Sequence, residues 1–302
     1  MWIKLVFLGT SAAVPTRDRG LPCIALIRNG RIALFDVGEG AQYKMLIYGL
    51  SVLRVHAIYI THPHGDHVFG LPGLIHTMNM YGATHKLKIY APKPVIKFLE
   101  ETFEMSGHKP LFDVELYELS PGLTSKFQDL TIKAFTVDHI DNSYGFTIQQ
   151  PMIPGKFNPE AALKLGVPKG PLWKRLQMGE DVTLPDGRIV RSKDVVGEPR
   201  PGVKIVYTGD TRPIDVVVKE SRDADVLIHD STFDSSLKEL AYKQGHSTAY
   251  DAAVIAKDAN VMLLILTHIS ARYKDCKILE DEARKVFSRS LVAEDGLTVY
   301  LR

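Results

Sequence analysis

Short apolar runs separated by turn residues dominate the first sixty positions of the chain. Their β-branched and apolar composition predicts four strands, at Ile3–Leu8, Ile24–Arg28, Ile32–Asp36 and Ala57–Ile60. Asn29-Gly30, between the second and third runs, is a strong hairpin signal because both residues tolerate the left-handed backbone of a tight turn. Apolar residues at helical spacing over Glu39–Tyr48 predict a helix before the fourth strand.

The rest of the chain alternates between the two periodicities. Helical spacing predicts helices at Val68–Tyr81, Pro94–Met105, Asp215–Glu220, Thr248–Lys257 and Ile278–Phe287. Strands and turns are expected over residues 111–149, and further strands at Val203–Tyr207, Val226–His229 and Val261–Leu266, with a closing strand pair near Leu291–Leu301. A β-rich first half and a β/α second half predict an α/β fold in four layers, an α/β/β/α sandwich of two facing sheets with helices outside.

Residues 150–201 depart from this pattern and form a segment that we call the arm. The arm is rich in Pro and Gly, its apolar periodicity is weak, and it is too long for an ordinary connection between two strands. Within 150–178, five positive residues face one acidic residue, Glu160, which leaves a local charge of +4. We therefore expect one domain over residues 1–302 with a functional basic arm inserted at 150–201, and a solvated surface loop is the alternative.

Composition narrows the class of protein. The net charge of +2 does not mark a nucleic-acid binder, so any such surface must be local. Cys23 and Cys276 are too few for a disulfide framework or a thiolate zinc site. The first residues lack the basic leader of a signal peptide, and no apolar run approaches the roughly 20 residues that span a membrane. A cytoplasmic location is the expectation.

The strongest chemical signal is the segment from Thr61 to His67. It places His62, His64, Asp66 and His67 directly after an apolar strand, with Gly65 allowing the backbone to bend. Imidazole and carboxylate groups suit zinc and other divalent metals, and burying so many polar side chains without a metal would be costly. The segment predicts a metal site, with a solvated polar turn as the alternative.

Three other strands also end in residues of the metal-ligand type, at His139, Asp210 and His268. In this order the chain resembles the metallo-β-lactamase superfamily over nearly its whole length. The resemblance implies two zinc ions per chain, which would activate a water and clamp phosphodiester oxygens. The implied ligands are His62, His64 and His139 for one ion, Asp66, His67 and His268 for the other, and Asp210 between them. The other histidines, His56, His76, His85, His108 and His229, fit no ligand spacing.

Further motifs narrow the resemblance to the ribonuclease Z family. These are Gly9–Arg19, Phe35–Gln42, Gly245–Thr248 (His-Ser-Thr), His268–Tyr273 (Ala-x-Arg) and Lys169–Trp173, which is similar to the Gly-Pro tip of a tRNA-gripping arm. The resemblance implies an endoribonuclease that removes the 3′ trailer of precursor tRNA after the discriminator nucleotide. It also implies a homodimer, in which one subunit's arm holds the tRNA for the other subunit's site.

The resemblance assigns roles within this site. Asp66 would orient or deprotonate the attacking water, and His246, oriented by Asp230, would protonate the leaving 3′ oxygen. Asp230 stands where the family commonly has Glu, so a shifted backbone or a longer hydrogen bond to His246 is expected. The implied substrate-binding residues are Arg17, Arg19, Lys169, Gly170, Pro171, Ser247 and Arg272. For each of these a surface or helix-capping role is the alternative.

Two other functions fit part of these observations. A hydrolase of a small phosphodiester or sulfate ester would use the same ligands and would not need the arm. A noncatalytic RNA-binding protein with a relic site would need the arm and not the intact ligand set.

Overall fold

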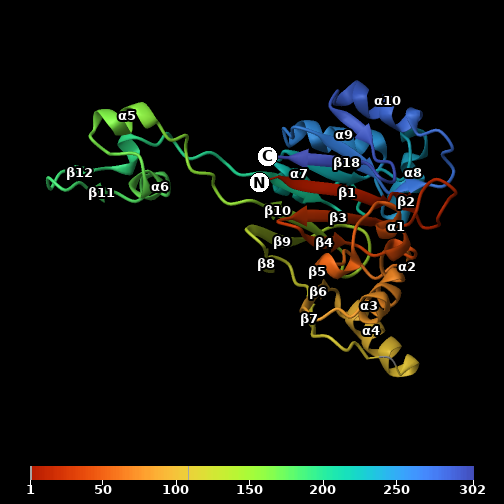
Figure 1. The fold of residues 1–302 in the computed structure, drawn as a ribbon. Helices are drawn as coiled ribbons and strands as arrows, with labels where there is room; N and C mark the ends of the chain where they lie inside the picture. The colour runs from red at the N-terminus through yellow and green to blue at the C-terminus, as the bar shows by residue number, and fades with distance from the viewer. Residues whose placement is uncertain (1, 108) are drawn as a thin grey trace. The chain divides into compact units, whose positions relative to one another are not determined.

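A computed structural model describes residues 2–107 and 109–302 of the chain (Figure 1). His108, for which we expect no part in the site, lies outside the described residues. The chain forms two units, one of residues 1–148 and 204–302 and one of residues 149–203, which contains the arm.

The first sheet of the larger unit has seven strands in the order β18-β1-β3-β4-β5-β6-β7. They are β1 (Ile3–Gly9), β3 (Cys23–Arg28), β4 (Arg31–Phe35), β5 (Val55–Tyr59), β6 (Leu87–Ala91), β7 (Val114–Glu118) and β18 (Thr298–Leu301). The expected hairpin joins β3 to β4, and Asn29 (φ 52°) and Gly30 (φ 76°) both adopt the left-handed conformation of its turn.

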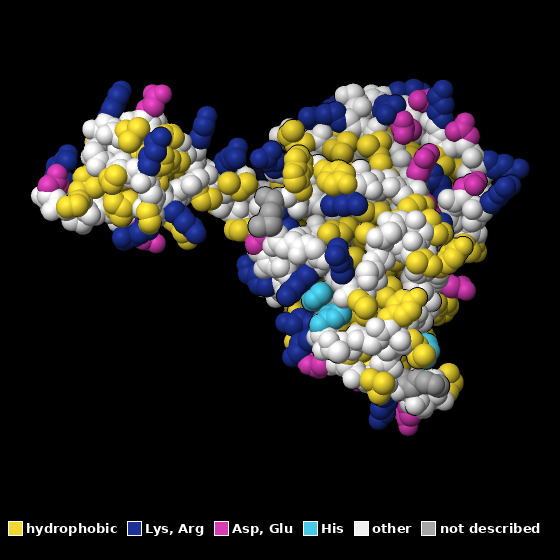
Figure 2. Space-filling view, viewed as in Figure 1, with side chains coloured by type: hydrophobic (Ala, Val, Ile, Leu, Met, Phe, Trp, Pro, Cys, Tyr) yellow, Lys and Arg dark blue, Asp and Glu magenta, His cyan; other side chains and the backbone are white. Residues whose placement is uncertain are grey.

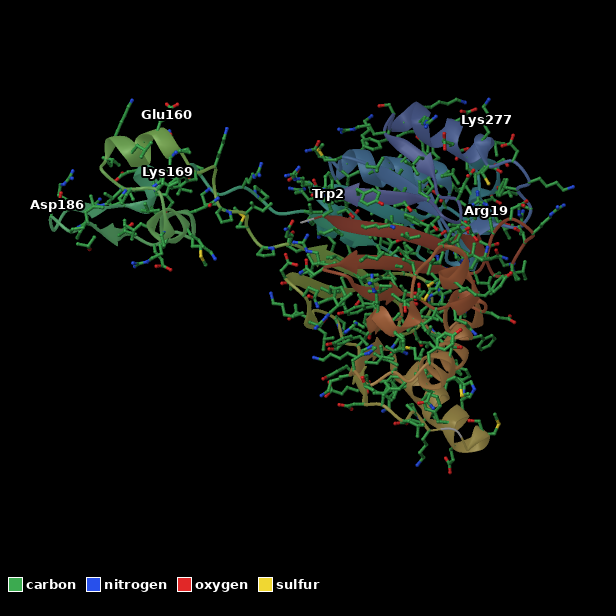
Figure 3. All side chains as sticks on the ribbon, viewed as in Figure 1. Trp2, Arg19, Glu160, Lys169, Asp186 and Lys277 are labelled. Carbon is green, nitrogen blue, oxygen red and sulfur yellow. The ribbon has the colours of Figure 1, made fainter. Side chains whose placement is uncertain are left out.

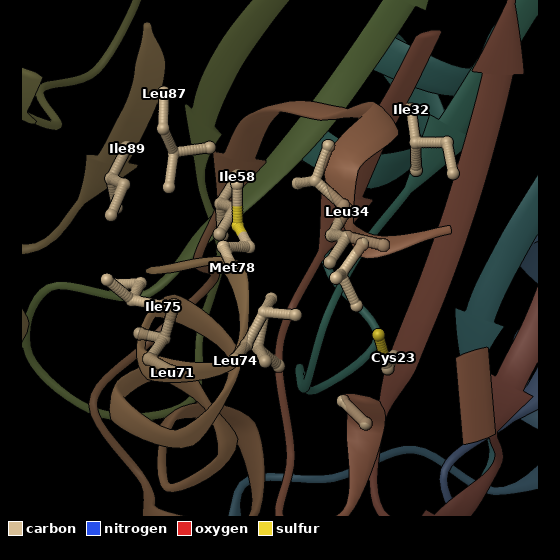
Figure 4. Packing of buried hydrophobic residues seen from close by; sticks show 14 of the residues in the cluster. Cys23, Ile32, Leu34, Ile58, Leu71, Leu74, Ile75, Met78, Leu87 and Ile89 are labelled. Atoms are coloured by element: carbon tan, nitrogen blue, oxygen red, sulfur yellow. The ribbon is translucent and has the colours of Figure 1, made fainter. Parts of the chain in front are cut away.

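Helices cover the outer face of this sheet. They are α1 (Ala41–Ile47), α2 (Gly65–Val68), α3 (Gly70–Met80) and α4 (Lys93–Ser106), with the 3-10 turn η1 (Val52–Arg54). Leu71, Leu74 and Met78 of α3 pack against buried residues of the strands, as Figure 4 shows. The helix predicted over 68–81 is confirmed as α3, which begins two residues later because the chain breaks at Phe69 after the short helix α2. The strand β6 was not predicted.

The second sheet has the order β17-β15-β14-β13-β10-β9-β8. Its strands are β8 (Thr124–Phe127), β9 (Leu130–Thr136), β10 (Tyr144–Gln149), β13 (Lys204–Tyr207), β14 (Val226–Asp230), β15 (Leu264–Thr267) and β17 (Ser290–Val292). The helices here are α7 (Asp215–Ser221), α8 (Lys238–Gln244), α9 (Ala249–Asp258) and α10 (Lys277–Val286), with the 3-10 turn η3 (Ser235–Leu237). A short parallel pair, β2 (Ser11–Ala12) with β16 (Ile269–Ser270), connects the loops that follow β1 and β15.

The two sheets meet through a layer of aromatic rings. Phe35 of the first sheet lies 5.6 Å from Phe146 and 6.2 Å from Tyr207 of the second sheet, between ring centroids. With α1, α3 and α4 outside one sheet and α9 and α10 outside the other (Figure 1), the predicted four-layer α/β/β/α sandwich is confirmed.

The end of the chain differs from the prediction. The last two strands do not pair with each other, because β17 joins β15 in the second sheet and β18 joins β1 in the first. The helix α8 was also not predicted. Among the described residues, no helix is both long enough and apolar enough to cross a membrane.

The unit of residues 149–203 has a small core of its own. It contains α5 (Pro159–Lys164), α6 (Pro171–Gln177), the hairpin β11 (Val182–Thr183) with β12 (Ile189–Val190), and the 3-10 turn η2 (Ser192–Asp194). Its buried residues are Ala162, Val167, Leu176, Val182, Leu184, Val190 and Val195. The sequence did not reveal these elements because each is at most two turns or two residues long, too short for a period to emerge.

Candidate metal centre

The predicted ligands lie at one edge of the two sheets, each directly after a strand. His62–His67 follow β5, His139 follows β9, Asp210 follows β13 and His268 follows β15. The strands β13, β14 and β15 are parallel neighbours, so their carboxyl ends meet at the same edge. The fold therefore gathers residues that are up to about two hundred positions apart in the chain.

One cluster contains His62, His64, His139 and Asp210. His64 Nδ1 lies 3.1 Å from His62 Nε2 and 3.1 Å from His139 Nε2. Asp210 Oδ2 lies 3.6 Å from His62 Nε2 and 3.8 Å from His139 Nε2. Zinc–nitrogen bonds of about 2.0–2.1 Å in a tetrahedron place ligand atoms about 3.3 Å apart, so these separations fit one metal ion.

A second cluster contains Asp66, His67 and His268. His268 Nε2 lies 3.4 Å and His67 Nε2 3.6 Å from Asp66 Oδ2. Asp210 Oδ2 approaches this cluster too, at 3.2 Å from His268 Nε2 and 3.5 Å from His67 Nε2. One carboxylate oxygen thus faces both clusters.

Charge and hydrogen bonding fit metal ions at both positions. His67 Nε2 and Asp210 Oδ1 are buried and have no hydrogen-bond partner, although buried polar atoms are otherwise nearly always paired. Burial lowers the pKa of His62 well below its usual value, which favours the neutral imidazole that binds a metal. Asp36, Asp210 and Asp230 are buried and Asp66 is partly buried, and this concentration of carboxylates favours cations nearby.

Asp36 orients two of the histidines from behind. Asp36 is fully buried, and its Oδ2 accepts hydrogen bonds from His67 Nδ1 at 2.8 Å and from the Tyr207 hydroxyl at 2.7 Å. The Thr61 hydroxyl donates to the same carboxylate at 3.0 Å and lies 2.9 Å from His62 Nδ1. With Nδ1 of both rings held, Nε2 is left to face the metal position.

Asp230 makes the matching arrangement on the second sheet. Its Oδ1 accepts from the Thr232 hydroxyl at 2.7 Å, and that hydroxyl lies 2.8 Å from His268 Nδ1. Its Oδ2 lies 2.8 Å from Nδ1 of His246. The hydrogen bond from His246 is not lengthened by the shorter Asp side chain, so the expected looser contact is not seen.

His246 borders the ligands: its Nδ1 lies 3.9 Å from Asp210 Oδ2, and with Asp210, Asp230 and His268 it forms a third group that could hold a metal ion. It also has the properties of a proton donor. Burial lowers the pKa of His246, but the charge and the hydrogen bond of Asp230 outweigh this effect and raise the pKa to about 9. The ring therefore carries a proton at neutral pH and stays fixed by its partner.

Gly245 connects His246 to the first cluster. Its carbonyl lies 2.9 Å from His139 Nδ1, and its own backbone is left-handed, with φ 81°. A Cβ at this position would lie 2.6 Å from His139 Nδ1. Glycine is thus required here both by conformation and by the close approach of the histidine ring.

The predicted substrate-binding arginines of the larger unit differ in their exposure and in their contacts within the protein. Arg17 is exposed, and the exposed Arg272 stacks over Phe233 at 4.8 Å, which in turn lies 6.2 Å from His246. Arg19 (labelled in Figure 3) is held by the fold, since its guanidinium donates to the Thr10 hydroxyl, the Ala293 carbonyl and Cys276 Sγ.

Ser247 does not lie where a phosphate contact requires. It is fully buried and its hydroxyl donates to the Thr211 carbonyl at 2.7 Å, so we correct its assignment to a structural residue. The cap of α9 is Thr248, which forms a capping box with Asp251. Lys169, Gly170 and Pro171 are exposed in the other unit, at the start of α6.

Comparison with known proteins places these features in a family. Residues 3–155 match the family model described as Anti-Pycsar protein Apyc1, and residues 195–269 match the Beta-lactamase superfamily domain. Neither match includes residues 156–194 of the arm. Proteins named Ribonuclease Z from Gemmatimonas aurantiaca and Haloferax volcanii are 45% and 44% identical to the chain, each over 98% of it and over 95% and 94% of their own length.

Each of the two family models matches only part of the chain, whereas these relatives match nearly all of it. The relatives therefore decide the family. The chain belongs to the ribonuclease Z family. The crystal structure of human tRNase Z, short form, agrees, with a TM-score of 0.71, 28% identity and coverage of 98% of both chains. As a ribonuclease Z homologue, the chain is an endoribonuclease and therefore a hydrolase.

Sequence reasoning missed the residues behind the ligands. Asp36, Thr61, Thr232 and Tyr207 were given no role, although Asp36 lies in one of the family motifs and directly follows the strand β4. The signal that could have found Asp36 is a carboxylate at the end of a strand whose neighbour in the sheet leads into the ligand segment.

We expect Asp36→Asn to weaken metal retention, because an amide cannot accept hydrogen bonds at both oxygens from Thr61, His67 and Tyr207. Removing such supporting hydrogen bonds typically costs about 10–100-fold in metal affinity. Metal content after dialysis against graded chelator measures this effect. Asp251→Asn, which changes a buried carboxylate in the α9 cap, is the matched control. Equal metal retention in Asp36→Asn and the control would show that Asp36 does not support the centre.

Proposed function

We propose that this endoribonuclease removes the 3′ trailer of precursor tRNA by hydrolysing the phosphodiester after the discriminator nucleotide. The products would be a tRNA with a 3′ hydroxyl and a trailer with a 5′ phosphate. The observation that carries the proposal is the His246–Asp230 pair beside two candidate metal clusters, in a chain 45% identical to a protein named Ribonuclease Z.

Two zinc ions per chain are the metals that we propose. His62, His64 and His139 would hold one, Asp66, His67 and His268 the other, and Asp210 would contact both. When bound, such ions supply Lewis acidity and lower the pKa of water toward neutrality. The imidazole and carboxylate donors suit zinc by ligand type.

The protein's own groups would manage the protons of the reaction. Asp66 would orient the attacking water or take its proton; its Oδ2 is itself positioned by the backbone N–H of Ala13 at 2.9 Å. As the water oxygen bonds to phosphorus, the bond from phosphorus to the 3′ oxygen breaks. His246, protonated and held by Asp230, would donate its proton to that leaving 3′ oxygen.

Substrate contacts would come from both units. Arg272, stacked over Phe233 close to His246, is placed to pair with a phosphate, and the exposed Arg17 is a second candidate. The arm would bind tRNA through Lys169, Gly170 and Pro171, aided by its positive charge. We further propose a homodimer, in which each arm serves the partner's site, and a cytoplasmic location that suits a tRNA substrate.

End mapping of the cleavage products tests this proposal. With zinc present, the protein should cut precursor tRNA after the discriminator and leave a 3′ hydroxyl and a 5′ phosphate. Internal cuts within the mature tRNA, or a cyclic phosphate on the upstream product, would contradict it.

His246→Ala should slow single-turnover cleavage by roughly 10²–10⁴-fold, the usual contribution of general acid catalysis. Metal content should stay near that of the unchanged protein, since His246 is outside both proposed ligand sets. His56→Ala, at a half-buried histidine stacked on His85, is the control and should cleave normally. Unchanged cleavage by His246→Ala would remove the residue from the mechanism.

Replacing residues 151–201 by a short flexible linker should weaken precursor tRNA binding and spare hydrolysis of a small phosphodiester. The cut is feasible because the Gln150 N–H donates to the Val203 carbonyl at 2.8 Å, so the two ends are adjacent. The whole segment is replaced because a shorter deletion would remove only part of the small core around Leu176 and leave the rest of that core exposed. The slope of log affinity against log salt should fall by about 0.7–0.9 for each phosphate that the arm no longer neutralises.

A control retains the fold of the arm and reduces its charge, with Lys164, Lys169 and Lys174 changed to Gln. It should reproduce the weaker salt dependence. Unchanged tRNA affinity and slope in both variants would refute the arm's role. A simultaneous fall in small-ester hydrolysis and in melting temperature would show that the arm is structural.

A further inference from the structure

An exposed cluster of aromatic and cationic side chains lies at the far end of the β1–β18 pair. Trp2 directly precedes β1 and Lys4 lies in it, while Tyr300 lies in β18 and Arg302 directly follows it. Trp2 is 53% exposed and Tyr300 58%, so both rings present open surface. We call these four residues the strand-end cluster; Figure 3 labels Trp2.

The four side chains contact one another across the two strands. Lys4 is paired directly with Tyr300 in the sheet register, and its Nζ lies 5.7 Å from the ring centroid. The Arg302 guanidinium lies 5.5 Å from the Trp2 ring, and the Trp2 and Tyr300 rings meet edge to face at 6.3 Å. Each ring therefore has a cation beside it and retains open surface.

Burial along β1 decreases toward this corner of the first sheet. Further along β1, Val6 and Leu8 are buried in the core cluster formed with α1, α3 and α4. Lys4 is only half-buried and Trp2 is exposed. In Figure 2, Lys and Arg side chains lie beside hydrophobic ones around this part of the molecule. Cross-strand pairs of this kind also protect an edge strand, but that purpose does not require two large exposed rings.

We propose that the strand-end cluster binds single-stranded RNA. Aromatic rings on the open face of a sheet stack with bases, and adjacent Lys or Arg side chains neutralise the phosphates between them. Stacking of this kind is tolerant of sequence, because every base has a flat face. The proposal uses only the membership in a ribonuclease family and does not depend on tRNA being the substrate.

The cluster is separate from the metal centre. The strand β1 leads from it to Gly9, a span of about 20 Å at roughly 3.3 Å per residue, before the chain reaches Ala13 beside Asp66. RNA bound here would be a strand that extends well beyond the scissile bond, and the cluster would hold it without touching the reacting atoms.

Trp2 itself provides the readout. The chain has two tryptophans, so Trp173→Phe leaves Trp2 as the only one. In this variant, titration with a short oligouridylate, which offers no tRNA structure, should quench Trp2 emission in a saturable manner. The Trp2→Ala, Tyr300→Ala double variant, followed by oligonucleotide anisotropy, should bind oligouridylate more weakly by roughly 5- to 150-fold for each base that no longer stacks on a ring.

Conservative and charge variants separate binding from folding. Trp2→Phe with Tyr300→Phe keeps both rings and should retain affinity. Lys4→Gln with Arg302→Gln should lower the salt slope by about 0.7 for each phosphate that is no longer neutralised. Tyr81→Ala, at an exposed ring after α3, is the control and should change nothing.

Results of two kinds would overturn the proposal. One is Trp2 emission that stays constant while oligouridylate saturates the protein, or equal affinity in the Ala double variant. The other is Trp2 emission that depends on protein concentration without RNA, which would show that the cluster is buried between copies of the chain. Failure of tRNA cleavage would leave this test unaffected, because oligouridylate binding is measured without it.

Discussion

The candidate centre depends on two buried carboxylates, Asp36 and Asp230, that accept hydrogen bonds from the backs of its histidines. Each carboxylate contacts one imidazole directly and a second one through a threonine hydroxyl. Asp36 contacts His67 directly and His62 through the Thr61 hydroxyl. The same pattern serves His246 and His268 at Asp230. Because Nδ1 of each ring is held in this way, Nε2 of each ring is left free for the proposed metal ions or, at His246, for the proposed proton transfer.

These carboxylates are held in turn by the meeting of the two sheets. Asp36 directly follows β4 of the first sheet, yet it accepts a hydrogen bond from Tyr207 of β13 in the second. Asp36 and His268 both adopt left-handed backbone, with φ of 58° and 59°, at the points where strands end. Strain of this kind persists where the surrounding structure determines the conformation, as the buried hydrogen bonds do here. The geometry of the site therefore depends on how the two sheets pack against each other.

Much of this was predictable, and the rest was hidden for identifiable reasons. A ligand that follows an apolar strand has a clear signature, so the ligand segments and most strands could be read from the sequence. The burial of a polar side chain has no such signature in the sequence. Ser247, for example, resembles a phosphate-binding residue by its motif, but its hydroxyl donates to the Thr211 carbonyl. Arg19 is similarly engaged by contacts that lie far away in the chain. The helices of the arm are too short for periodicity, and their core forms only once they fold together.

The central claim is that these supported histidines converge on two metal positions that share Asp210. Anomalous diffraction at the zinc edge, from crystals grown with zinc, tests it directly. Two peaks are expected, one near His62, His64 and His139 and one near Asp66, His67 and His268, each about 2.0–2.2 Å from its ligand atoms, with Asp210 touching both. A single peak, or peaks that Asp210 does not join, would contradict the account.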